Sequence, residues 1–269
     1  PILPLDLFKN HTFSLTSALG AIIGAGMFGA IVMLPLYLQV VKGASATEAG
    51  LKLIPLMLGI VTTSIFSGKA ISKTGKYKKF PIMGTTLMTV GILLMVTLTR
   101  ETPFWQLSIF SILVGAGLGL SMQTIVIALQ NSVDFKDMGV ATSSNTFFRS
   151  LGSVFGTALF GSILTNRVTH YLESGFNELA TTNPAAVSGF DPATLEQLSS
   201  NTSVLKELPL LVQNTALDAF VNSFHVVFLA AAPVTALGIV LALMLREAPL
   251  RTNQDYAAAR EDAAGEALG

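Results

Sequence analysis

The sequence predicts an all-α integral membrane protein, a bundle of six transmembrane helices. Hydrophobic residues make up 51% of the 269 residues and charged residues only 12%, and the mean hydropathy is +0.63, which is far from the balance of a soluble domain. The apolar residues also gather in stretches that each reach the roughly 20 helical residues needed to cross a bilayer core. Membrane strands are much shorter, about 9 to 11 residues, so the pattern favours helices over a closed barrel.

The predicted spans follow one another with short polar connections until residue 166. A cytoplasmic lead-in at residues 1–11 precedes them, and transmembrane helices one to five occupy residues 12–166. We expect these five within 12–41, around 46–68, at 80–99, within 102–133 and at about 138–166, and the sixth at 219–245.

Two longer segments are polar enough to lie outside the bilayer. Residues 167–218 predict an extracytoplasmic loop with short amphipathic helices, one of them at "DPATLEQL" (191–198), which has an Asp N-cap followed by Pro. The stretch "VLKELPLLVQNTALDAF" (204–220) has helical periodicity, and we expect it to lie along the outer interface. Residues 246–269 are polar and Ala-rich, which is typical of a loose cytoplasmic tail.

The distribution of Lys and Arg predicts the orientation, because short cytoplasmic loops carry the excess of these residues. With the N-terminus inside, the outer connections hold only Lys42, Lys52, Arg100, Arg167 and Lys206. The inner connections hold the larger set, which is Lys9, Lys69, Lys73, Lys76, Lys78, Lys79, Lys136, Arg246, Arg251 and Arg260. We therefore expect a multi-pass protein of the plasma membrane with both ends in the cytoplasm.

The inner loop "GKAISKTGKYKKFP" (68–81) concentrates lysine between two apolar spans. One interpretation is a plain orientation signal. The other is a motif, G-x-x-x-x-K-x-G-K, in which Gly68 ends the second span and Gly75 forms a tight turn. Lys73 and Lys76 can then meet helix ends or carboxylates across a domain boundary.

This loop resembles the cytoplasmic motif of the major facilitator superfamily, whose usual form is G-x-x-x-D-R-x-G-R. Ser72 stands where the family has Asp, and Lys73 and Lys76 stand where it has Arg. The departures are similar to the weaker, second copy of the motif, between the eighth and ninth core helices. The stretches "LPLYLQVVKGASATEAGLKLIPLMLG" (34–59), "GAGLGLSMQTIVIALQNSV" (115–133) and "MGVATSSNTFFRSLGSVFGTALFG" (138–161) resemble the C-terminal half of the fourteen-helix drug:proton antiporters.

The resemblance implies secondary active export of drugs or other amphipathic compounds, coupled to proton entry by alternating access. Its implied partners are the lipid bilayer, a small amphipathic substrate, protons and the missing N-terminal half of the same transporter. The chain begins with Pro1 and shows no signal peptide, so we expect a piece of a longer protein. Two alternatives stay open, a facilitator-superfamily carrier of a different small solute and a six-helix membrane partner module that does not itself transport.

Arg149 is the foremost candidate for the transport pathway. Eleven residues separate it from Met138, which places it roughly 16 Å along the fifth span and close to the bilayer midplane. A charge there costs at least about 2.5 to 3.5 kcal/mol on insertion scales, so it should face protein or a wet cavity. Asn145, Gly152 and Gly156 share its helix face. The alternative is a structural arginine bonded to backbone carbonyls or to a polar group of another helix.

Other cavity candidates are polar or adaptable side chains within the spans. Gln123 and Gln130 follow Gly115 and Gly119 on the fourth span, where the glycines favour close helix packing. Met27, Phe28 and Phe147 are possible apolar contacts for a substrate, and ordinary packing is the alternative.

Pro35 and Pro55 are the hinge candidates, because proline removes a backbone hydrogen bond and can kink a span. A plain structural bend is the alternative. His225, near the outer end of the sixth span, can titrate near neutral pH, but interfacial packing or solvation is the favoured explanation.

The sequence offers no signature of an enzyme. It has no cysteine, no nucleophile beside a base, no metal-ligand cluster and no phosphate-binding loop, so we expect no catalysis, no metal, no cofactor and no nucleic-acid partner. None of the carboxylates lies deep within a span. The proton carrier of an antiporter must then come from outside this segment, which agrees with the interpretation as a fragment.

Overall fold

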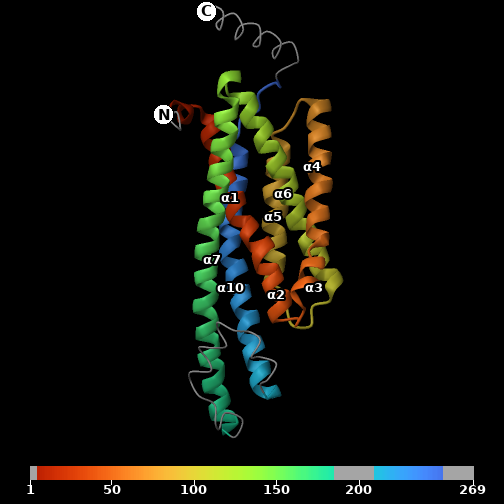
Figure 1. The fold of residues 1–269 in the computed structure, drawn as a ribbon, viewed down its shortest axis with the longest axis vertical. Coiled ribbons are helices and arrows are strands. Elements are labelled where there is room, and N and C mark those ends of the chain that lie inside the picture. Colours follow the sequence, from red (N-terminus) through yellow and green to blue (C-terminus); the bar gives the residue numbers. More distant parts are fainter. Residues whose placement is uncertain (1–4, 185–208, 251–269) are drawn as a thin grey trace, which may run out of the picture.

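The computed structural model describes residues 5–184 and 209–250, and Figure 1 shows their arrangement. Every element in these two ranges is a helix, so the predicted all-α fold is confirmed. Within the described ranges, five helices are long and apolar enough to cross a membrane, and a sixth apolar helix is shorter. The fold is therefore a six-span helical bundle.

The first span is a helix in three parts. After the short η1 (Leu5–Lys9), α1 (His11–Phe28) continues through a π-helical turn, η2 (Gly29–Met33), into α2 (Leu34–Val40). Together they form one helical run from His11 to Val40. The wider π-helical turn lies directly before Pro35, which occupies the first turn of α2.

The second span begins with a separate short helix. In α3 (Ala46–Leu51), the Ser45 side chain accepts from the backbone N–H of Glu48, whose carboxylate accepts from the N–H of Ser45, a capping box. Then α4 (Ile54–Thr74) starts with Pro55 in its first turn. Proline breaks no intrahelical hydrogen bond at that position, so Pro55 begins a helix and does not kink one.

The third and fourth spans are α5 (Lys79–Met95) and α6 (Phe104–Ser132). The third ends four residues earlier than the predicted limit of residue 99, and turns occupy the remainder. A short 3-10 turn, η3 (Phe135–Asp137), then leads into the fifth span.

The last two spans are much longer than the sequence suggests. α7 (Met138–Thr182) has 45 residues and α10 (Leu210–Met244) has 35, or about 68 Å and 53 Å at 1.5 Å per residue. The expected start of a loop at residue 167 is wrong, because α7 continues to Thr182. The expected interfacial helix is also wrong for residues 210–220, which form the start of α10, while "DPATLEQL" lies outside the described residues.

In the view of Figure 1, α7 and α4 lie at opposite edges of the helical bundle. α4 packs against α6, α6 against α5, and α7 against both α1 and α10, which also contacts α5. The shared core includes Leu19, Met88, Val114, Phe160 and Phe228, all fully or almost fully buried.

Both edge helices keep apolar side chains on their outer faces. The exposed side chains are Met57, Leu58, Val61, Ile65 and Phe66 on α4, and Phe147, Val154, Phe155 and Leu159 on α7. Such faces suit lipid or another protein surface.

The chain after α10 is anchored to the bundle. The Nδ2 of Asn131, near the end of α6, donates to the carbonyl of Pro249 at 2.9 Å, and Leu245 is fully buried. The expectation of a loose tail is wrong for residues 246–250, and residues 251–269 lie outside the described part.

Candidate functional site

The face of α7 that carries Arg149 packs directly on α1. A methyl group added to Gly24 would overlap the carbonyl oxygen of Arg149, and one added to Gly152 would overlap that of Ala21. A methyl group on Gly156 would lie 2.8 Å from the Cα of Ala25. The two backbones therefore approach as closely as small residues allow, which fixes α7 against the first span.

Arg149 lines a small cavity at this crossing. The cavity, about 10 Å³ in volume, lies between α1, α6 and α7 and is lined by Gly20, Ile23, Met122, Ile125, Asn145 and Arg149. This is about the space of one water molecule. The Arg149 side chain is half-buried, and its guanidinium forms no hydrogen bond or ion pair with any other described residue.

Asn145, one helical turn earlier, has a structural role instead. It is 3% exposed, and its Nδ2 donates to the backbone carbonyl of Thr16 at 2.8 Å. Thr16 itself donates from its hydroxyl to the carbonyl of Thr12. The amide therefore joins α7 to α1. Asn145 and Arg149 share a helix face as predicted, but only the Asn145 side chain has a hydrogen-bond partner on α1.

The glycines of α6 serve helix packing. Gly115 and Gly119 lie against Leu56 and Ile60 of α4, and Gly117 lies against Gly84 of α5. The Thr63 hydroxyl donates to the carbonyl of Ala116 at 3.0 Å across the same contact.

The two glutamines of α6 are placed differently. Gln123 is exposed and lies beside Gly68, where a methyl group would be 3.9 Å from its Cγ. Gln130 is half-buried, and its Nε2 donates to the hydroxyl of Thr142 on α7 at 3.3 Å. The structure does not bring either glutamine to the Arg149 cavity.

The apolar candidates are not gathered around Arg149. Met27 is partly buried against the main core, whereas Phe147 is 55% exposed on the outer face of α7, where its ring lies 5.5 Å from that of Phe148. The side chain of Phe28 is outside the described part of the structure.

For the lysine loop, the structure confirms the expected role of Gly75 and contradicts that of Gly68. Gly75 ends α4 with φ +69°, a left-handed conformation that glycine adopts without strain. Gly68 does not end the helix, which continues through Lys73 to Thr74. Lys73 and Lys76 are exposed and form no ion pair within the described residues.

Tyr77 is a structural residue of this loop that the sequence did not single out. Its side chain is 1% exposed and packs with Ile71, Ala128 and Leu245. Its hydroxyl donates to the carbonyl of Arg246 at 3.1 Å and accepts from the N–H of Ala248 at 3.0 Å. The sequence around Tyr77 is rich in lysine and contains no pattern that predicts a buried tyrosine.

Polar contacts join the ends of α5, α2 and α10 at the opposite end of the bundle. Arg100 donates to Asp218 at 3.3 Å and to the side-chain oxygen of Asn214 at 2.6 Å. Lys42 donates to the carbonyl of Thr102 at 2.8 Å, and burial lowers its pKa. The Nε2 of His225 lies 2.5 Å from the carbonyl oxygen of Leu98. His225 therefore makes a polar contact with the chain after α5 in addition to its packing.

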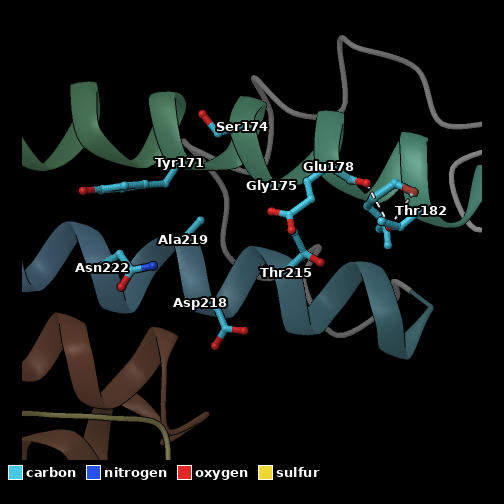
Figure 2. Close-up of a pocket in the computed structure, with 10 residues that line it drawn as sticks. Tyr171, Ser174, Gly175, Glu178, Thr182, Thr215, Asp218, Ala219 and Asn222 are labelled. Carbon is cyan, nitrogen blue, oxygen red and sulfur yellow. Dashed lines mark hydrogen bonds between the residues drawn. The ribbon is translucent and has the colours of Figure 1, made fainter.

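A cavity of about 740 Å³ lies at this polar end. Its lining includes Val41, Arg100, Glu101, Asn214, Asp218, Asn222 and His225. A second cavity, the α7–α10 groove, has about 420 Å³ and is lined by Tyr171, Ser174, Gly175, Glu178, Leu179, Thr182, Thr215, Asp218, Ala219 and Asn222. Figure 2 shows Tyr171 and Glu178 on α7 facing Thr215 and Asn222 on α10 across this groove.

The sequence prediction contains no such groove, because it places residues 167–182 in a loop, whereas they belong to α7. A signal was available: Phe160, Leu164, Val168, Leu172 and Phe176 recur every four residues, the spacing of one helix face. All five are buried, so the pattern continues the helix well past the apolar span.

Comparison with known proteins gives a consistent result. The family model of the Major Facilitator Superfamily matches residues 1–157. An uncharacterized MFS-type transporter of Mycobacterium tuberculosis is 40% identical over 256 residues, which is 95% of this chain and 35% of the relative. A tetracycline resistance determinant of Streptomyces rimosus is 33% identical over 280 residues, 98% of this chain and 80% of the relative.

A further relative is the multidrug transporter protein MdtP of Bacillus subtilis, which is 33% identical over 260 residues, 91% of this chain and 48% of the relative. The chain thus matches only part of the mycobacterial and Bacillus proteins, 35% and 48% of their lengths.

Proposed function

Because the chain belongs to the major facilitator superfamily, we propose that it is the C-terminal half of a transporter that exports drugs or other amphipathic compounds from the cell. The names of its Streptomyces and Bacillus relatives, a tetracycline resistance determinant and a multidrug transporter, support this cargo. An additional N-terminal half of the same protein would complete the pathway, which agrees with the partial coverage of the longer relatives.

The transporter would lie in the plasma membrane with both ends of this chain in the cytoplasm. Lys73, Lys76 and the other lysines of the α4–α5 loop would then be inside, as the distribution of positive charge favours. The polar ends of α7 and α10 would project from the outer surface. For α7, the charged residue Arg167 follows about 44 Å of helix from Met138, which exceeds the bilayer core of about 30 Å, and His170 and Glu173 lie further along the helix.

Transport would proceed by alternating access, in which the two halves rock about a cavity near the midplane. In this chain α1, α6 and α7 would line that cavity, and Arg149 carries the proposal. Arg149 lines the small cavity between the three helices, and its guanidinium has no partner among the described residues. A charge at that depth needs a partner, which substrate, water or the other half of the transporter would supply.

Proton entry would drive export. The membrane potential alone supplies about 2.3 kcal/mol per charge per 100 mV. The spans of this chain hold no deep carboxylate that could carry the proton, so the carrier would lie in the N-terminal half. The lysine loop would latch the two halves in one of the two states, since Lys73 and Lys76 are exposed and free of ion pairs within the described residues.

Ethidium efflux from cells that express the full-length gene product tests the proposal. Cells preloaded with the dye should lose it faster than cells with an empty vector, and chemically unrelated amphipathic cations should compete. Equal rates in the two strains, with the protein present in the membrane, would refute export of such compounds. Competition by a single solute and its close analogues would indicate a dedicated carrier instead.

A further inference from the structure

We propose that the α7–α10 groove is an outer binding site for organic cations with an apolar body. The inference rests on the proposed function, because it takes these compounds to be the cargo of the transporter. It is carried by the shape of the groove, by the charges of its walls and by one aromatic side chain.

The groove has the size and the fixed walls of a ligand site. Its volume of about 420 Å³ falls within the range of roughly 300 to 1,000 Å³ that is common for small-molecule sites. Leu172 and Phe176 of α7 and Ala216 and Phe220 of α10 are buried between the helices below it. This packing holds the two walls at a constant separation, so little ordering would oppose binding.

The charges of the groove favour a cation. Glu178 lies on the α7 wall, and no Lys, Arg or His is among the described residues that line the groove. Glu178 forms no ion pair within the described residues, whereas the Asp218 carboxylate on α10 points away from α7 (Figure 2) and is paired with Arg100 at 3.3 Å. A carboxylate on the α7 wall without an ion pair among the described residues attracts a positive ligand and disfavours an anion.

The remaining lining accommodates an apolar body. Tyr171 presents a half-exposed ring at one end of the groove (Figure 2), where a cation can lie against its face. Leu179 and Ala219 contribute apolar lining, and Gly175 lets α10 approach closely, since a methyl group there would lie 2.7 Å from Cγ2 of Thr215. A small lipophilic cation matches these features better than an inorganic ion or a sugar does.

The groove also adjoins the polar end of the bundle. Asp218 and Asn222 line both the groove and the cavity of about 740 Å³ next to it. A compound released at the outer end of the bundle can therefore reach the groove along α10.

Cysteine protection locates the site. The chain has no native cysteine, so Ser174→Cys in the groove and Asn177→Cys on the exposed side of α7 give a matched pair in the full-length gene product. Tetraphenylphosphonium should slow the reaction of Ser174→Cys with a membrane-impermeant maleimide at least threefold and leave Asn177→Cys unchanged. The neutral triphenylphosphine oxide should protect less. Equal rates with and without the cation at Ser174→Cys would overturn the proposal.

A second pair of variants tests the charge. Glu178→Gln should weaken tetraphenylphosphonium binding about tenfold, whereas Glu173→Gln, on the same helix but outside the groove, should leave it unchanged. Identical affinity in the two variants would also overturn the proposal.

Efflux of tetraphenylphosphonium in the wild type separates this inference from the proposed function. Efflux without protection at Ser174→Cys would refute the groove site and leave the exporter intact. Protection without efflux would refute export and leave the groove site intact.

Discussion

Arg149 and Asn145 lie one turn apart on α7, yet their environments differ. The Asn145 amide is bonded to the Thr16 carbonyl and buried, whereas the Arg149 guanidinium is half-buried beside a cavity without a partner among the described residues. The sequence predicts their common face, because helical spacing decides it. The sequence does not predict which of the two side chains forms a hydrogen bond with α1, because this depends on the register between the two helices.

Arg149→Ala should abolish efflux while the protein still folds and inserts. The substitution removes a charge that we place in the pathway, so ethidium efflux should fall at least tenfold at equal expression. Arg167→Ala, which removes an arginine from the same helix near its polar end, should retain efflux. A fully active and well-expressed Arg149→Ala protein would remove this residue from the mechanism.

Tyr77→Phe should destabilise the cytoplasmic end of the bundle. The change deletes the hydroxyl that joins Arg246 and Ala248, and a lost buried hydrogen bond costs about 1 to 3 kcal/mol. Thermal unfolding in detergent should therefore begin at a lower temperature, and Thr86→Val, on the exposed side of α5, serves as the control. An unchanged melting temperature would show that the tail is not held by this hydroxyl.

The same residue predicts a dependence on pH. Burial raises the pKa of Tyr77 above the ordinary tyrosine value of about 10, so the folded state binds this proton more tightly than the unfolded state does. The stabilisation is fully present below about pH 10 and is lost as pH rises through the folded pKa. Tyr77→Phe should lack this loss of stability at high pH.

At the scale of elements, the contact between α1 and α7 depends on glycine. Gly152→Leu would force a side chain into the backbone of Ala21, and overpacking typically costs about 1 to 3 kcal/mol. The melting temperature should fall and transport with it. Gly161→Ala on the same helix is the matched control, since a methyl group there meets no atom within 4 Å. Equal stability of the two variants would contradict the close contact.

The lysine loop gives a second prediction for an element. Lys73→Gln with Lys76→Gln should lower efflux while leaving membrane insertion intact, because the latch between the two halves loses its charges. Lys78→Gln with Lys79→Gln removes the same charge outside the motif and should have a smaller effect. Unchanged efflux in the first variant at equal expression would defeat the latch hypothesis.

The lengths of α7 and α10 show where sequence reasoning failed. Hydropathy predicts where a span crosses the bilayer, but a helix can continue beyond it when another helix covers its apolar side. Val168 and Leu172 of α7 are covered in this way, and so are Val212 and Ala216 of α10. The first proline after Met138 is Pro184, so nothing in the backbone chemistry ends α7 before that position.

At the scale of the whole molecule, composition and apolar segment length were sufficient to predict the six-span all-α bundle. They were sufficient because every backbone N–H and C=O group in lipid must be hydrogen-bonded within the protein, which leaves only helices and closed barrels as spanning structures. The order in which the helices pack, with α4 and α7 at the edges, depends on side-chain fit and could not be obtained in this way. The α7–α10 groove is a product of that packing and was equally hidden.

The central claim is that this chain belongs to a proton-driven exporter of amphipathic compounds. Ethidium accumulation in inside-out membrane vesicles that contain the full-length gene product tests it most directly. An acidic vesicle interior should drive accumulation of the dye, an uncoupler should collapse it, and Arg149→Ala vesicles should show none. Accumulation that does not respond to the proton gradient, or none at all with the wild-type protein present, would contradict the account.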